Sequence, residues 1–235
     1  MATTSQAPKQ SIIIAGILSI LLLLFIVSLT GSNPVLQLFG TTAINATVLF
    51  ISRIGYWVCL LFIWFYAIKI EKQNLLLWDE KHYKWTMHLL SFLAIFGAII
   101  LGSGLINGIL YIAHIKEHSD KMDMIMAIFR TNKPLMVLTA FTAGVTEELI
   151  FRGYMQPRLE LLFKNSWVAI FISSFLFGLM HYRYGTLVNM LVPFFMGLVF
   201  AFYYSRYRNI KLLILFHFVW DMLVVIAHLL PHHLK

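Results

Sequence analysis

Long apolar segments are the feature that most constrains the fold of this chain. Several stretches approach or exceed the roughly 20 apolar residues that a transmembrane helix needs, and short polar connections separate them. Of the 235 residues, 60% are hydrophobic and only 12% are charged. A soluble domain cannot bury that much apolar surface. The sequence therefore predicts an all-α fold, a polytopic transmembrane helix bundle.

We expect seven helices, or eight, in a single integral membrane domain covering residues 1–235. Residues 10–130 would form the N-terminal helices, and residues 134–230 would form the helices that carry the polar residues discussed below. The mixed segment 71–87 suits an interfacial connector, and the polar segment 115–133 is expected to be a connection. The expected helices are 12–30, 43–69, 88–114, 134–162, 166–182, 186–205 and 210–230.

The basic residues predict the orientation of the chain in the membrane. The net charge is +8, but Lys and Arg are spread over short connections without a basic run, so we expect no nucleic-acid partner. With the N-terminus in the cytoplasm, most of these residues, such as Lys69, Arg158 and Lys211, fall on the cytoplasmic side. This bias predicts a cytoplasmic N-terminus. The short chain favours a bacterial plasma membrane, with membrane lipid as the surrounding partner.

Ionisable residues within the late apolar helices call for a specific explanation. Such a side chain at mid-membrane costs about 2.5–3.5 kcal/mol on insertion scales, so it persists when it faces a partner or a cavity. Glu148 and Arg152 are four residues apart, so they share a helix face and can form an ion pair. Glu147 is rotated by about 100° from Glu148. One glutamate is therefore expected to be neutralised, and the other is left free.

Two further helices carry imidazole groups at the same helical spacing. His217 and Asp221 share a face in HFVWD, and Phe177 and His181 share a face in FGLMH. Each group alone has a structural explanation, such as charge at a helix end, a histidine at the water interface or a hydrogen bond between turns. If the faces converge, however, carboxylates and imidazoles surround one small hydrated cavity. These are the groups that a hydrolase uses.

The segments EELIFR, FGLMH and HFVWD resemble the EExxxR, FxxxH and HxxxN/D motifs of the CPBP family of intramembrane proteases. This family includes the type II CAAX prenyl endopeptidases and bacteriocin-processing and bacteriocin immunity proteins. The resemblance covers roughly residues 134–230, and the earlier residues match only as hydrophobic helices. It implies a glutamate-dependent intramembrane endopeptidase, a hydrolase, acting on a peptide bond of a membrane-associated, prenylated or small peptide substrate.

The resemblance also implies roles for individual residues. Glu147 and His181 would activate a water molecule, and His217 with Asp221 would face the developing oxyanion. The Glu148–Arg152 pair would hold the helix in shape. A glutamate in a desolvated pocket is a better general base than one in water, and a ring N–H can donate to an oxyanion.

Asp221 departs from the prenyl endopeptidases, which have asparagine at this position. An ionised carboxylate accepts hydrogen bonds and cannot donate one to an oxyanion. Asp221 would therefore have to be protonated, or it would orient His217 and stabilise the charged imidazole, as the aspartate of a catalytic triad does.

Metal dependence is open at the level of the sequence. Two histidines and a carboxylate can bind zinc, and the ligands would then be His181, His217 and Asp221. We favour a reaction that requires no cofactor, in which the water is activated without metal.

Three alternatives remain. The chain could be a non-catalytic immunity or scaffold protein of the same family that binds a peptide or lipidated protein in its cavity. It could be a transporter, because intramembrane ionisable residues also mark proton relays, although no inverted repeat supports this. Finally, HIKEH at 114–118 matches the HxxEH pattern of inverted zincins.

Overall fold

The long apolar segments form helices in a computed structural model of the chain, which describes residues 8–115 and 118–230. Within these ranges there is no strand, and six helical segments are long and apolar enough to cross a membrane. The predicted all-α polytopic bundle is therefore confirmed. The helices are α1 (Gln10–Ser28), α2 (Asn33–Leu38), α3 (Ala46–Tyr66), α4 (Trp85–Ile112), α5 (Asp120–Thr131), α6 (Lys133–Glu148), α7 (Gln156–Phe163), α8 (Ser166–Met180), α9 (Val188–Tyr207) and α10 (Ile210–Leu229).

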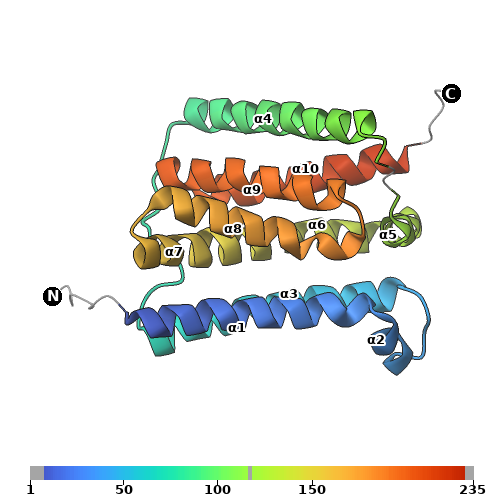
Figure 1. Ribbon diagram of the computed structural model, residues 1–235, viewed down its shortest axis with the longest axis horizontal. Coiled ribbons are helices and arrows are strands. Elements are labelled where there is room, and N and C mark those ends of the chain that lie inside the picture. The colour runs from blue at the N-terminus through green and yellow to red at the C-terminus, as the bar shows by residue number, and fades with distance from the viewer. Residues whose placement is uncertain (1–7, 116–117, 231–235) are drawn as a thin grey trace.

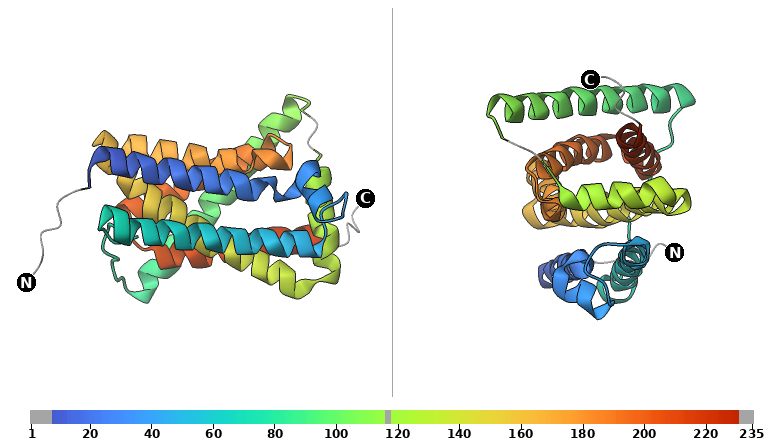
Figure 2. Two further views of the ribbon diagram at one scale, coloured as in Figure 1. Left: turned by 90° about the horizontal axis from the view of Figure 1, so that it is seen from below. Right: turned by 90° about the vertical axis from the view of Figure 1, so that its right-hand side faces the viewer.

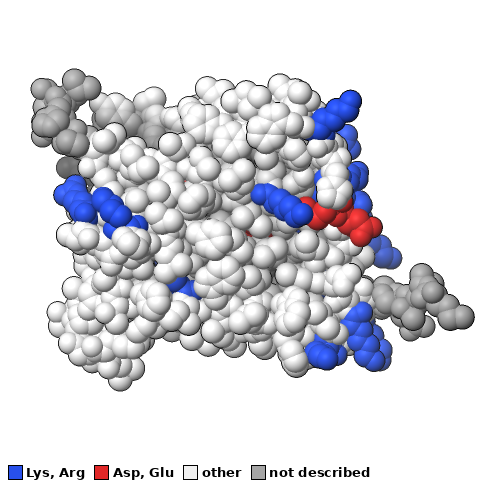
Figure 3. Space-filling view, turned by 180° about the vertical axis from the view of Figure 1, so that it is seen from behind, with Lys and Arg blue, Asp and Glu red and all other residues white. Residues whose placement is uncertain are grey.

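The helices are arranged in layers (Figures 1 and 2). Helices α1 and α3 lie side by side on one side of the molecule, α6 to α10 form the middle, and α4 covers the opposite side. Figure 3 shows that most Lys and Arg side chains lie toward the two ends of the long axis, with a mainly uncharged face between them. This is the distribution expected of a bundle whose sides contact lipid.

Asparagine side chains fix the starts of several helices. Asn45, Asn132 and Asn209 each accept a hydrogen bond from the backbone N–H three residues later. Asn165 accepts from two backbone N–H groups at the start of α8. These side chains satisfy donors that have no partner within the helix, a role for which asparagine is among the preferred residues. The helix boundaries are thus encoded by single polar residues at the ends of apolar runs.

The expectation that residues 115–133 form only a polar connection was wrong, because α5 lies within it. Ser119 caps α5 by accepting a hydrogen bond from a backbone N–H, and Ile125, Met126 and Phe129 are buried on one side of this amphipathic helix. The apolar residues at this spacing form a stripe that packs against α3 and α6. The high polar content of the segment concealed this stripe.

A buried ion pair fastens the connector after α3 to α7. Arg158 and Glu71 both have side chains that are 0% exposed. Arg158 donates to Glu71 from Nε over 2.7 Å, and the Tyr154 hydroxyl donates to the other carboxylate oxygen over 2.7 Å. The guanidinium also donates to the carbonyls of Asn74 and Leu75. Arg158 is therefore not a free loop cation, and its cluster is satisfied within the protein.

We predict that Glu71→Gln destabilises the fold, because it leaves the Arg158 charge buried without a counterion. The expected loss is about 3–5 kcal/mol, the range for breaking a buried pair by removing one partner. Thermal unfolding of the detergent-purified protein would measure it. Asp79→Asn is the matched control, since Asp79 is an exposed acid in the same connector. Equal stability of the two variants would contradict this account.

Candidate active site

The helix that carries the two adjacent glutamates changes its winding immediately after them. Glu147 and Glu148 lie in the last turn of α6, and residues Leu149–Met155 continue as a π-helical segment that leads into α7. A π segment places more residues in each turn, and such segments occur frequently at functional sites. Arg152 lies within this segment, four residues after Glu148.

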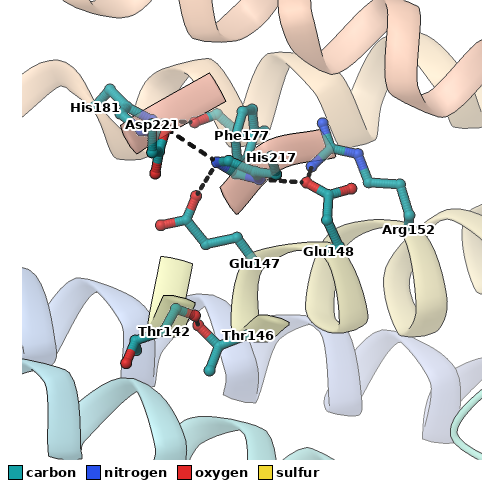
Figure 4. Close-up of polar contacts among 9 residues, drawn as sticks. All are labelled: Thr142, Thr146, Glu147, Glu148, Arg152, Phe177, His181, His217 and Asp221. Atoms are coloured by element: carbon teal, nitrogen blue, oxygen red, sulfur yellow. Dashed lines mark hydrogen bonds and ion pairs between the residues drawn. The ribbon is translucent and has the colours of Figure 1, made fainter. Parts of the chain in front are cut away.

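One carboxylate oxygen of Glu148 is hydrogen-bonded to two basic side chains. Arg152 donates from Nη1 to Glu148 Oε1 over 2.9 Å, and His217 Nδ1 lies 2.8 Å from the same oxygen. The three side chains are at most 3% exposed. The predicted ion pair is present, and it extends to α10 through His217 (Figure 4).

The hydrogen bond to Glu148 determines how His217 faces the site. An ionised carboxylate only accepts, so Nδ1 of His217 carries the proton and Nε2 is directed to the other side of the ring. There Nε2 lies 3.9 Å from Glu147 Oε2 and 3.7 Å from Asp221 Oδ1. Both distances exceed a direct hydrogen bond, and gaps of this size suit a bridging water or a substrate oxygen.

Glu147 makes only a loose contact with an ionisable partner, the 3.9 Å approach to His217. Its side chain is 13% exposed, and its Oε2 atom is buried with no hydrogen-bond partner among the described residues. The residue lines a cavity of about 460 Å³ together with His181, His217 and Asp221. Burying a polar oxygen without a partner is costly, so this atom is suited to contact a molecule that enters the cavity.

His181 lies at the end of α8 with one ring nitrogen committed. Its Nδ1 is 2.9 Å from the Phe177 carbonyl oxygen. A carbonyl oxygen only accepts, so Nδ1 donates, and Nε2 of the neutral ring keeps its lone pair. The ring also packs against the rings of Phe177 and Tyr184, with centroids 5.1 and 5.9 Å away. These contacts fix the imidazole on the cavity wall.

Phe177 supports both sides of the site. Its ring lies edge-on to His217 and beneath the guanidinium of Arg152, whose Cζ is 4.3 Å from the ring centroid. The ring is fully buried. An aromatic face beside a desolvated guanidinium contributes favourable electrostatic contact. Phe177 thus contacts both imidazoles while it stabilises the charged pair.

The proposed zinc ligands do not form a metal site here. Within residues 8–115 and 118–230, no group of three or more His, Cys, Asp or Glu side chains has an arrangement that could hold a metal ion. This includes the set of His181, His217 and Asp221. Structural and catalytic zinc sites need at least three protein ligands that converge on one point. We therefore derive no chemical step through a metal.

The described residues of the HIKEH segment form no second metal site. Residues 116 and 117 lie outside the described residues. The exposed His118 contacts Asp120, with Nε2 and Oδ1 3.0 Å apart, and neither residue lines the large cavity.

Reasoning from the sequence missed residues of the early helices that also line the cavity. Arg53 and Tyr56 from α3 and Tyr184 from the segment after α8 belong to its wall. Arg53 is a cation within an apolar helix, which is itself a signal of function in a membrane protein. Arg53 is the one charged residue of α3, so the same signal that marks the late helices is present there.

Comparisons with known proteins find similarity in the segment that includes α6 to α10. Residues 130–223 match the family model described as Type II CAAX prenyl endopeptidase Rce1-like. Over 121 residues the chain is 29% identical to the Bacillus subtilis (strain 168) protein named "Putative membrane peptidase YdiL", which covers 52% of this chain and 48% of that protein. The match thus spans about half the length of this relative. No solved structure matches the chain.

We predict that the two glutamates differ in their effect on stability. Glu148→Gln should lower the free energy of unfolding by about 3–5 kcal/mol, because Arg152 loses its buried counterion. Glu147→Gln should leave stability unchanged or raise it, since Glu147 Oε2 makes no hydrogen bond among the described residues and approaches His217 only to 3.9 Å. Thermal unfolding of both variants in one detergent would compare them. An equal loss in the two variants would refute this division.

Proposed function

We propose that this membrane protein, which belongs through residues 130–223 to the type II CAAX prenyl endopeptidase Rce1-like family, is an intramembrane endopeptidase. The observation that carries the proposal is the Glu147 carboxylate. It lines a large cavity without a hydrogen-bond partner among the described residues, and two imidazoles line the same cavity. A carboxylate in such a desolvated position is suited to general-base catalysis.

In the first step Glu147 takes a proton from a water molecule in the cavity. The lone pair on His181 Nε2 accepts a hydrogen bond from the second O–H of this water, which stays intact, and so orients the water. The water oxygen then attacks the carbonyl carbon of the peptide bond, and the carbonyl electrons move to its oxygen. Because the imidazole is already held in place, less entropy is lost when the water is aligned with the peptide carbonyl.

In the same step His217 stabilises the oxyanion. Donation from Nε2 requires the imidazolium form, because Nδ1 already carries a proton toward Glu148. The carboxylates of Glu148 and Asp221 flank the ring and stabilise its positive charge, as a triad aspartate does. Asp221 thereby acts through His217 and does not contact the oxyanion. This explains how aspartate can replace the asparagine of the prenyl endopeptidases.

In the last step the tetrahedral intermediate collapses. The carbonyl re-forms, the carbon–nitrogen bond breaks, and Glu147 returns its proton to the leaving amine. The carboxylate is then regenerated as a base. The products are a peptide with a new carboxyl group and a peptide with a new amine.

The substrate we infer is a membrane-associated, prenylated or small peptide. Apolar residues such as Met136, Val192 and Met196 line much of the cavity, and this lining suits an apolar segment better than a charged one. We further infer that the chain resides in a bacterial plasma membrane with its N-terminus in the cytoplasm, from the distribution of basic residues described above.

We predict that Glu147→Gln and His181→Ala each lower the cleavage rate by about 10²-fold or more, the usual contribution of a positioned base. Purified protein would be incubated with a pool of membrane-associated and prenylated peptides, and products would be identified by mass spectrometry. Glu160→Gln in α7 is the control, because Glu160 does not line the cavity.

Cleavage that persists in both variants would exclude Glu147 as the base. No cleavage by the unmodified protein across the pool, together with tight peptide binding, would instead favour the non-catalytic immunity or scaffold protein.

We also predict that cleavage continues at an unchanged rate after treatment with a chelator. The proposed steps use only side chains of the chain and a water molecule. The measurement is the cleavage rate before and after dialysis against a strong zinc chelator, with the metal content of the sample determined in parallel. Loss of activity that added zinc restores would overturn the metal-free mechanism.

A further inference from the structure

The large cavity occupies one half of the bundle along its long axis. Helices α3, α6 and α9 begin at the end of the molecule where α5 lies, and α4, α8 and α10 finish there (Figures 1 and 2). We call this the α5 end. The helices that begin there line the cavity from their starts to near their midpoints, for example with Arg53 and Thr139. The helices that finish there line it from near their midpoints to their ends, for example with Ser103 and His228.

The opposite end of the bundle, where α1 begins, is joined by polar contacts and lies away from the cavity. We call it the N-terminal end. The Glu80 carboxylate accepts a hydrogen bond from the Ile210 backbone N–H, and the Lys81 N–H donates to the Arg208 carbonyl. The buried ion pair between the connector and α7 lies at the same end. No described residue of the connector or of α7 lines the cavity, so the site has no route through this end.

At the α5 end the cavity reaches the surface of the molecule. Asn107 of α4 and His228 of α10 both line the cavity and are exposed. Asn189, in the first turn of α9, lines it too. Polar side chains at such a rim suit contact with water better than contact with lipid tails. A water-soluble segment of a substrate therefore has its route to Glu147 from the α5 end.

Exposed basic residues identify the side of the membrane on which each end lies. Among the described residues, two exposed basic side chains lie at the α5 end, Arg130 and Lys133. Half-buried cations at this end, such as Arg53, are too few to balance those at the other. A cytoplasmic N-terminal end and an extracytoplasmic α5 end follow from this excess. The N-terminal end carries eight exposed basic side chains: Lys9, Lys69, Lys72, Lys81, Lys84, Lys164, Arg206 and Lys211.

The depth of the site limits the form of its substrate. Glu147 lies 14 residues after Lys133, the first residue of α6. At 1.5 Å per residue this places Glu147 about 21 Å along the helix from the α5 end. An extended chain rises about 3.3 Å per residue, so about six residues are needed to cover this length. A flexible peptide segment can span it, whereas a bond within a folded domain cannot.

We propose that substrates enter the site from the extracytoplasmic side. The substrate class is then exported peptides, or the exported flexible ends of membrane proteins. This inference rests on the proposed peptidase function and on the cytoplasmic N-terminus, and it deepens both, because it specifies where the scissile bond is presented. A peptide in the cytoplasm is excluded until it has crossed the membrane, since its polar backbone cannot pass unpaired through the hydrocarbon core.

The first experiment determines which end faces the cytoplasm. Asp123→Cys in α5 and Asp79→Cys in the connector are a matched pair, since both replace exposed acids. The native Cys59 is 1% exposed and offers no accessible thiol. Intact bacterial cells producing each full-length variant would be treated with a sulfonated, membrane-impermeant maleimide. We expect labelling of Asp123→Cys in intact cells, and labelling of Asp79→Cys only after the membrane is permeabilised.

The second experiment tests access to the cavity without any need for cleavage. Thr139→Cys places a thiol on the cavity wall, and Ser174→Cys is the control, because Ser174 is fully buried and does not line the cavity. Sealed right-side-out and inverted vesicles would be treated with a charged methanethiosulfonate reagent. We expect Thr139→Cys to react only in right-side-out vesicles and Ser174→Cys in neither. If Thr139→Cys fails to fold, Ser103→Cys on α4 repeats the test from another wall.

The third experiment places the cleavage itself. A pool of peptides carrying a sulfonated dye, which cannot cross the bilayer, would be added outside the same two kinds of vesicle containing the unmodified chain. We expect cleavage with right-side-out vesicles. With inverted vesicles we expect loss of nearly all cleavage until detergent opens them. Vesicles with Glu147→Gln measure the background from other peptidases.

The outcomes separate this proposal from the proposed function. The reverse labelling pattern for Asp123→Cys and Asp79→Cys, or a cavity thiol that reacts from the cytoplasmic side or from neither side, would overturn extracytoplasmic entry. Cleavage by inverted vesicles without detergent would overturn it as well. If the cavity thiol reacts only from outside but the unmodified chain cleaves no peptide even in detergent, the route of entry stands and the peptidase function fails.

Discussion

The absence of water inside the bilayer is the constraint on which this structure depends. A charge within the bundle must find its partner among the side chains of the same chain or face a water-filled cavity. Glu148 meets this requirement for Arg152 and His217 through a single carboxylate oxygen, and thereby joins α6 and the following π segment to α10. The same contact sets the tautomer of His217 and directs its second nitrogen toward the cavity. The same oxygen of Glu148 therefore holds the helices together and sets the state of His217.

The two buried acidic clusters differ in how completely they are satisfied. Glu71 accepts hydrogen bonds at both oxygens, and the arginine that neutralises it is surrounded by carbonyls. Glu147 has a buried oxygen without a partner among the described residues and faces a cavity instead. A satisfied cluster stabilises the fold, whereas a carboxylate left unpaired in a low-dielectric site is poised for proton transfer. Glu148 Oε2 is also buried without a hydrogen-bond partner among the described residues, so it is the position on the cavity wall that distinguishes Glu147 from Glu148.

The features that could be predicted from the sequence are those whose residues lie close together along the chain. Apolar runs and the four-residue spacing of Glu148 and Arg152 are local, so the helices and this ion pair were predictable. The π segment and the apolar stripe of α5 also depend on residues close together in the chain. Their sequence patterns are weak, however, and the many charged residues near the stripe make it hard to recognise. The pairing of Glu71 with Arg158 joins residues 87 positions apart, and no spacing rule reveals it. The roles of Glu147, His181, His217 and Asp221 remain predictions, because proximity alone does not test chemistry.

The wall of the cavity is built by two parts of the chain with different similarity to known proteins. The family match begins at residue 130 and includes the glutamates and both histidines, whereas Arg53 and Tyr56, which also line the cavity, lie before it. The reacting groups need fixed geometry, since small displacements of a base or an oxyanion donor cost large factors in rate. Groups that hold a distant end of a substrate can differ as the substrate differs. The matched segment thus carries the groups proposed for the reaction, and α3 adds Arg53 and Tyr56 to the rest of the cavity wall.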